Sequence, residues 1–229
     1  MFSEEYPFCF DTLLTFEGLK IYIQKASTLF TTLKDIEFAQ LEERKKKSHR
    51  PRWHSERWQH NRLFPMALNY SFVVLLFIEI ETRLQQTCDL LKKLKGLPLR
   101  ARDLRGDNIE QCVLFLEKFL EIQRNDLPDW QNISDLSKIR HCIVHTAGRI
   151  KDSKDNKYLR TLLGKYPHYF SLSTTDPESE LLIIDHQYCL AAADFGKSFF
   201  EGIFQKTGLH YDIGSQDLVK ESARHPAEG

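Results

Sequence analysis

The chain has 229 residues, of which 41% are hydrophobic and 28% charged, so it is long enough for one sizeable core and typical of a folded, soluble protein. Its formal net charge of zero excludes a global attraction to nucleic acid, which leaves local clusters of basic residues as the only source of such affinity. Five widely spaced cysteines without a Cys-x-x-Cys pair argue against a disulfide framework, and the acidic start MFSEEYPFCF is not a signal peptide, so we expect a cytoplasmic protein.

Most of the predicted elements are helices. Apolar residues recur at helical spacing in five stretches, which cover residues 11–47, 64–95, 108–123, 132–150 and 187–204. Asn132 and Ser134 are both plausible N-caps for the fourth helix, and KDSKDNK after it reads as a polar loop. YFSLS and ELLII, separated by TTDPES, predict a small β-hairpin or loop insertion at 169–184, before the last helix.

The predicted elements fall into three regions. Residues 1–63 form an N-terminal helix and a basic, tryptophan-containing segment, residues 64–207 form the helical core, and residues 208–229 form a disordered tail. The fold class is all-α, a bundle of four to five helices with one insertion. The apolar run SFVVLLFIEI is too short to span a membrane, so we expect no membrane contact.

The segment RKKKSHRPRWHSERWQHNR, residues 44–62, carries eight basic residues against one acid, whereas residues 1–43 carry eight acids against three bases. Basic side chains neutralise phosphates, and aromatic faces stack on unpaired bases. The segment therefore predicts contacts with single-stranded RNA, and the alternative is a solvated loop whose tryptophans anchor it to the bundle. The candidate RNA-binding residues are Arg50, Arg52, Trp53, Arg57 and Trp58.

The stretch IRHCIVHTAG, residues 139–148, places two histidines four residues apart directly after an arginine. On a helical wheel, His141 and His145 lie within about 40° of each other and nearly opposite the apolar stripe, and Gly148 shares their side. Histidine exchanges protons near neutrality, and the planar fork of Arg140 matches phosphate oxygens. Together these residue types suit phosphodiester cleavage by a ribose 2′-hydroxyl. The apolar stripe consists of Leu136, Ile139, Ile143, Ala147 and Ile150.

RHCIVH resembles the signature of the HEPN superfamily, in which an arginine and usually a polar residue precede a histidine four to six positions after the arginine. The surrounding WQNISDLSKIRHCIVHTAG, the upstream FIEIETRLQQTC with its acidic residue, and the connecting DLRGDNIEQCVLFLEKF resemble the same family. The resemblance covers roughly residues 64–150. It implies a HEPN-like bundle and a metal-independent endoribonuclease without a cofactor, often a toxin or antiphage effector, with its active site between two subunits.

Carried onto this sequence, the resemblance implies that Arg140 holds the scissile phosphate and that His145 transfers the proton. His141 takes the polar position, which is commonly asparagine in the family, and assists either residue. Glu81 matches the upstream acid and would pair with Arg140 or His145, the alternative being an ordinary surface charge. The expected products carry 2′,3′-cyclic phosphate and 5′-hydroxyl ends.

A homodimer through the signature-helix face also follows from helix geometry. Arg140 and His145 are separated by about 7.5 Å along the helix axis and about 140° around it, so one helix does not easily direct both at one phosphate. A two-fold axis through the histidine face would place a second arginine and histidine opposite.

Three other interpretations remain open. His141 and His145 with nearby Cys142 resemble a transition-metal pair, although no third ligand stands at motif spacing. The chain could instead be a non-catalytic HEPN-like dimerisation or RNA-binding module that serves as scaffold or sensor. A third interpretation is a toxin silenced by a cognate antitoxin or another defence-system partner.

Overall fold

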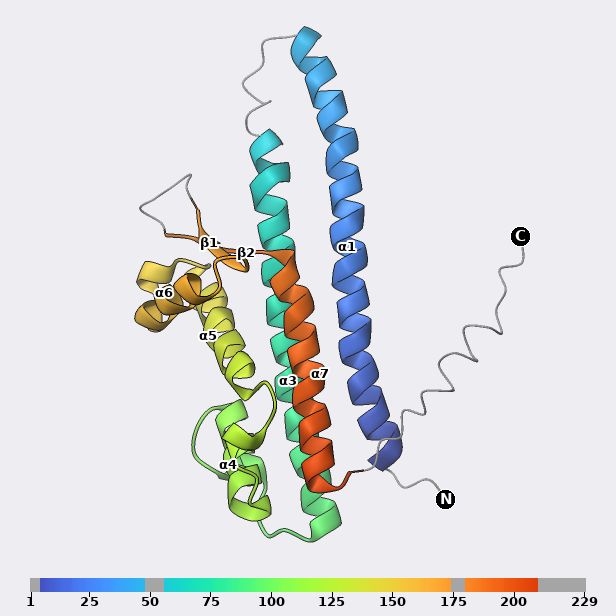
Figure 1. The fold of residues 1–229 in the computed structure, drawn as a ribbon, viewed down its shortest axis with the longest axis vertical. Helices are drawn as coiled ribbons and strands as arrows, with labels where there is room; N and C mark the ends of the chain where they lie inside the picture. Colours follow the sequence, from blue (N-terminus) through green and yellow to red (C-terminus); the bar gives the residue numbers. More distant parts are fainter. Residues whose placement is uncertain (1–4, 48–55, 174–179, 210–229) are drawn as a thin grey trace, which may run out of the picture.

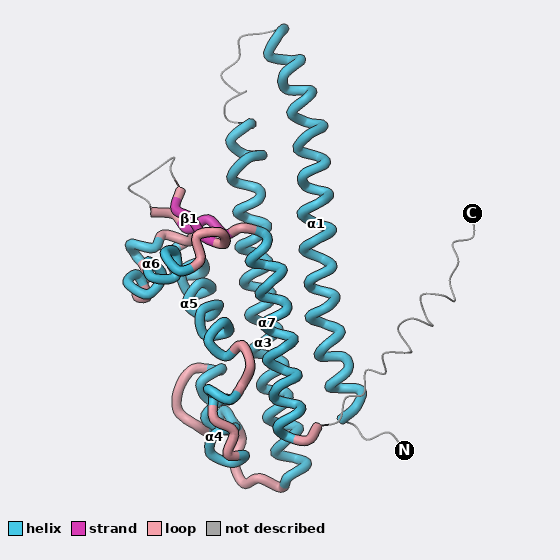
Figure 2. Tube along the Cα trace, viewed as in Figure 1, coloured by secondary structure: helices cyan, strands magenta, loops and turns pink. Residues whose placement is uncertain are grey.

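The computed structural model describes residues 5–47, 56–173 and 180–209, of which about 80% are helical. Three long helices run side by side, with three shorter helices on one side of them and one two-stranded hairpin (Figures 1 and 2). The long helices are α1 (Glu5–Lys47), α3 (Phe64–Lys95) and α7 (His186–Thr207), and the shorter ones are α4 (Asn108–Leu120), α5 (Trp130–Thr146) and α6 (Asn156–Lys165). The π-helical turn η1 (Gln59–Leu63) leads into α3, and the hairpin consists of β1 (Phe170–Leu172) and β2 (Leu182–Ile184).

The all-α fold with a small hairpin is confirmed, but the predicted number of helices is wrong, because the described residues hold six α-helices instead of four or five. The additional helix is α6, which begins at Asn156 within the predicted polar loop. Its first residues are polar, as in a loop, but the segment forms a short amphipathic helix in which Leu159 and Leu162 are buried. Ten residues give too little periodicity to be recognised beside that polar run.

The end of α3 follows the prediction. The second predicted stretch ends as expected, with Gly96 in the left-handed region (φ 63°) directly after α3. The predicted limits of α5 are wrong at both ends, because the helix begins at Trp130 and ends at Thr146, before the left-handed Ala147 (φ 52°). The hairpin is antiparallel, with Phe170 paired to Ile184.

Helix α1 belongs to the same core as residues 64–207, so the predicted boundary at residue 63 does not separate two cores. Its Phe16 ring lies 5.4 Å from that of Phe200 on α7, and a Cβ on Gly196 would come within 2.7 Å of the Phe16 ring. Among the described α1 side chains, none beyond Ile23 is buried. Beyond that point the side chains of α1 are half-buried or exposed, among them the apolar Leu29, Leu33 and Ile36.

The continuous helical segment Glu56–Lys95 is long and apolar enough to cross a membrane by length and composition. Its apolar character extends well beyond the run SFVVLLFIEI, and 33% of its most apolar window is buried in the bundle. Core helices pass the same test, and ten α3 side chains are buried here. These are Asn69, Phe72, Val73, Leu76, Phe77, Ile80, Leu84, Thr87, Cys88 and Leu91.

Candidate active site on helix α5

Helix α5 is held against α3 and α7 by one apolar face. Ile133, Leu136, Ile139, Cys142 and Ile143 are all buried, as expected for residues spaced three and four apart. This packing fixes the rotation of the helix about its axis. It directs the face that carries Arg140 toward α3 and leaves the face that carries His141 and His145 on the outer side of the helix.

Arg140 lies on the face of α5 that meets α3. Its guanidinium carbon is 5.5 Å from the centre of the Phe77 ring, and the side chain is half-buried. The Nε atom is buried without a hydrogen-bond partner, and within the described residues no hydrogen bond or ion pair holds the guanidinium. A buried donor without a partner costs about 1–3 kcal/mol. Arg140 is therefore a candidate for binding an acceptor that the described residues do not supply.

Glu81 on α3 is the acidic neighbour of Arg140. The pKa of the Glu81 carboxyl lies above its ordinary value, because burial and the charge of Asp107 raise it more than the Arg140 guanidinium and a hydrogen bond with Asn108 lower it. No ion pair joins Glu81 to Arg140, so the two interact through space. Glu79 instead contacts Arg83 on its own helix, with 3.7 Å between the charged atoms. Of the two acids in FIEIE, Glu81 is the one whose charge acts on Arg140.

His141 and His145 form a pair on the outer part of α5. Their ring centroids are 4.3 Å apart and their planes are inclined by 39°. His145 is exposed and His141 half-buried. Burial lowers the pKa of His141 most, and the charges of Lys154, His145 and Arg140 lower it further. His141 is therefore neutral at pH 7 and has a ring nitrogen free to accept a proton.

Lowering the pH should destabilise the fold through His141. Its pKa is lowered only in the folded chain, so below pH 6.5 the unfolded chain takes up a proton that the folded chain resists. We expect the free energy of unfolding, measured in urea at pH 7.5 and 5.5, to fall less in His141→Gln than in the natural chain. Lys154→Gln removes one of several causes of the shift and should give a smaller change in the same direction. An unchanged pH dependence in His141→Gln would contradict this assignment.

Lys154 is a site residue that the sequence did not reveal. It follows the short 3-10 turn Ile150–Asp152 and lies close enough to His141 for its charge to lower the pKa of that ring. The run KDSKDNK contains it, but only the reversal of the chain after α5 brings it back to the histidines.

One chain brings together Arg140 with Glu81 and His141 with His145, but it does not join the two pairs. No hydrogen bond or ring contact links Arg140 to His145. The two imidazoles also lie side by side, so they cannot stand on opposite sides of one phosphorus atom. Val144, beside His145, leaves 47% of its surface exposed.

Gly148 does not lie on the histidine face, and the expectation that it faces a second subunit is wrong. It is buried, with φ +82°, and an added Cβ would stand 2.1 Å from the Tyr70 hydroxyl oxygen. The helical wheel fails here because α5 ends at Thr146. Gly148 instead admits Tyr70 of the same chain and accepts a hydrogen bond from the Leu182 amide, 2.9 Å away.

The basic segment is described only in part. Arg50, Arg52 and Trp53 lie outside the described residues. Trp58 precedes η1 and leaves 45% of its surface exposed, while the Arg57 guanidinium lies 5.9 Å from the centre of the Phe38 ring. The alternative in which tryptophans anchor this segment is therefore not supported by Trp58.

Comparison with known proteins gives no match, since no family model, no curated protein and no solved structure is similar to this chain. Among the residues that the structure describes, no three His, Cys, Asp or Glu side chains are grouped so as to hold a metal ion.

Proposed function

We propose that this chain is a metal-independent endoribonuclease of the HEPN type that acts as a homodimer through the exposed face of α5. The observation that best supports it is the Arg140 guanidinium, whose buried Nε has no hydrogen-bond partner among the described residues and whose charge acts on both Glu81 and His141. Cleavage of a phosphodiester needs a guanidinium that binds the phosphate and groups that transfer the protons.

The proposed reaction is transesterification within the RNA chain. The ribose 2′-oxygen attacks phosphorus, forming the O2′–P bond as the P–O5′ bond breaks. An imidazole accepts the 2′-hydroxyl proton, and a protonated imidazole gives a proton to the leaving 5′-oxygen. Arg140 binds the non-bridging oxygens as negative charge develops on them. The products are a 2′,3′-cyclic phosphate and a 5′-hydroxyl, with no net change in protons.

Two copies of the chain complete this arrangement. Attacking and leaving oxygens lie on opposite sides of phosphorus, so acceptor and donor imidazoles have to stand on opposite sides as well. His141 and His145 of one chain lie 4.3 Å apart on one face, so the opposing imidazole has to come from the partner. We assign proton donation to His145 of one copy and proton acceptance to His141 of its partner, the copy that also supplies Arg140.

Cleavage in the presence of EDTA tests this function. The purified chain is incubated with a mixed RNA substrate and excess EDTA, and the ends of the fragments are identified by mass spectrometry. We expect fragments with 2′,3′-cyclic phosphate ends from the natural chain, and cleavage reduced by about 10²–10⁴ in His145→Ala. His145 is exposed, so its replacement should leave the unfolding midpoint almost unchanged.

The matched control is Lys118→Ala, which changes an exposed cation on α4, outside the site. It should cleave like the natural chain. Cleavage that appears only after a divalent metal is added would overturn the metal-independent mechanism. A dimer that binds RNA and leaves it intact would favour the non-catalytic module, for which the exposed Val144 beside His145 is the supporting observation. A role as a toxin or in antiphage defence, with an antitoxin or defence-system partner, belongs to the same proposal.

A further inference from the structure

A second candidate site lies at the N-terminal end of α7, away from the α5 histidines. Helices α1 and α3 continue past the level at which α7 begins at His186, and the hairpin closes the remaining side (Figure 1). The result is a cleft of about 460 Å³. Clefts of roughly 300–1,000 Å³ accommodate small organic ligands, so this one is large enough for a mononucleotide.

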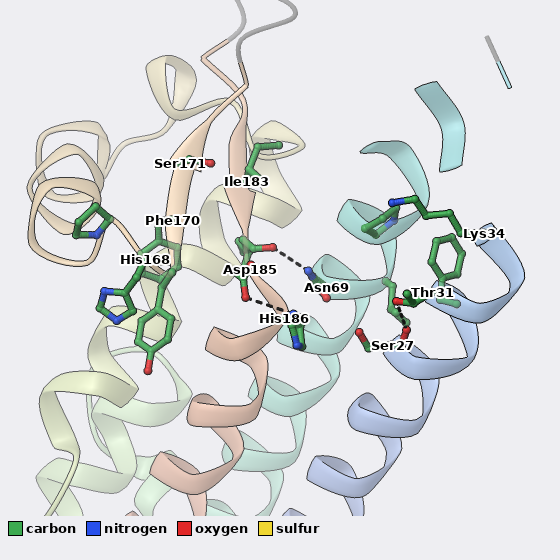
Figure 3. A pocket seen from close by; sticks show the side chains of 16 residues that line it. Ser27, Thr31, Lys34, Asn69, His168, Phe170, Ser171, Ile183, Asp185 and His186 are labelled. Atoms are coloured by element: carbon green, nitrogen blue, oxygen red, sulfur yellow. Dashed lines mark hydrogen bonds and ion pairs between the residues drawn. The ribbon is translucent and has the colours of Figure 1, made fainter. Parts of the chain in front are cut away.

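Polar groups reach this cleft from three different elements. Figure 3 shows Lys34 on α1 at one side, His168 before β1 at the other, and Asp185 with His186 between them. Asp185 leaves about half of its side chain exposed, and its Oδ1 lies 3.3 Å from Nδ1 of His186. The lining thus presents one fixed cation and one fixed anion, with two imidazoles that donate or accept hydrogen bonds.

Aromatic side chains form another part of the lining. Tyr169 and Phe30 belong to it, from the hairpin segment and from α1 respectively. The His168 and Tyr169 rings lie with their centroids 4.0 Å apart. A flat ligand ring gains from contact with such faces, by roughly 1–3 kcal/mol for a nucleobase. A purely aliphatic ligand would form no ion pair or hydrogen bond with the charged groups of the cleft.

The combination of charges selects among ligands. A simple anion would meet Lys34 but would be repelled by the Asp185 carboxylate, so phosphate alone is a poor fit. A ribonucleotide satisfies all three features, because it joins a phosphate to a sugar with hydroxyl donors and to a flat base. Carboxylates accept hydrogen bonds from ribose hydroxyls in other nucleotide sites. We propose that this cleft binds a ribonucleotide, either free or at the end of an RNA chain.

The role of Asp185 allows a conservative test of this proposal. Its Oδ1 accepts a hydrogen bond from the Gln187 amide at 2.8 Å and so caps α7. Asparagine caps a helix about as well, so Asp185→Asn removes the negative charge and should keep the helix start. Its effect on ligand binding is therefore separable from an effect on folding.

The experiment is calorimetric titration of the full-length chain with AMP, 2′-deoxy-AMP, adenosine and a short oligoadenylate. We expect AMP to bind more tightly than 2′-deoxy-AMP and than adenosine, by roughly tenfold in each case. Asp185→Asn should remove the preference for the ribose, and Lys34→Gln should remove the preference for the phosphate. Tighter binding of the oligonucleotide than of AMP would identify an RNA end as the ligand, and the reverse would identify a free nucleotide.

The matched control is Lys25→Gln, an exposed cation on the same helix that does not line the cleft. It should bind AMP like the natural chain. Absence of saturable binding by every probe, or equal binding by the two cleft variants and the natural chain, would overturn the proposal. The ribonucleotide site does not depend on cleavage at α5, so His145→Ala should bind AMP normally. Loss of one activity therefore leaves the other testable.

Discussion

Mixing equal amounts of Arg140→Ala and His145→Ala chains is expected to restore RNA cleavage that neither variant performs alone. The cleavage rate of each variant by itself should be lower by a factor of about 10²–10³, because one variant lacks the phosphate-binding group and the other lacks the proton-transfer group. In a mixed dimer, one chain keeps Arg140 and its partner keeps His145. If the two act across the interface, random pairing should restore about one quarter of the natural rate, since half the dimers are mixed and half their sites are complete.

This result separates two arrangements that a single chain cannot distinguish. No contact joins Arg140 to His145 within one chain, which favours their cooperation across the dimer. Sites in which both residues come from the same chain would remain inactive in every mixed dimer. The rate is measured after the variants have been unfolded and refolded together, with each variant refolded separately as the control. No recovery, with mixed dimers shown to be present, would contradict the shared site.

Gly148→Ala is expected to destabilise the fold strongly, by about 2–5 kcal/mol. The methyl group would stand 2.1 Å from the Tyr70 hydroxyl oxygen, and φ +82° is a conformation that alanine adopts only with strain. Chemical denaturation followed by circular dichroism measures the loss. RNA cleavage should fall as well, because the residue joins the end of α5 to β2 through the Leu182 amide.

The control for this substitution is Gly164→Ala on α6. Apart from its chain neighbours and the backbone of its own helix, no atom lies within 4 Å of the added Cβ. The backbone at Gly164 is helical. Alanine should therefore be neutral or stabilise the helix by up to about 1 kcal/mol. A Gly148→Ala chain as stable as Gly164→Ala would show that the contact with Tyr70 is not a fixed part of the fold.

Local chemistry explains which parts of the fold could be read from the sequence. The end of α3 was predictable because Gly96 and the nearby Pro98 both stop a helix. The hairpin was predictable from its short apolar strands and intervening turn residues. The end of α5 was not predictable, because Ala147 takes a left-handed conformation that an alanine in the sequence does not indicate.

The candidate site shows the same division. The spacing of Arg140, His141 and His145 was visible because all three lie on one helix. Glu81 was a candidate through the resemblance of the upstream α3 segment to the family, but its proximity to Arg140 depends on how α3 and α5 pack. Lys154 was missed for the same reason. The cleft beyond α7 was also not readable, since it depends on the level at which α7 starts beside α1 and α3.

The uneven burial along α1 divides its stability. Around Phe16, opening the helix would expose a ring stacked on Phe200, so the amides there should exchange with solvent only when the whole bundle unfolds. Beyond Ile23 no described α1 side chain is buried, and the helix is held there by partly exposed contacts such as Phe30 with Phe64 and Glu37 with His60, so those amides should be less protected. The single helix α1 thus contains two cooperative units. The outer unit can fray and re-form while the inner one stays closed.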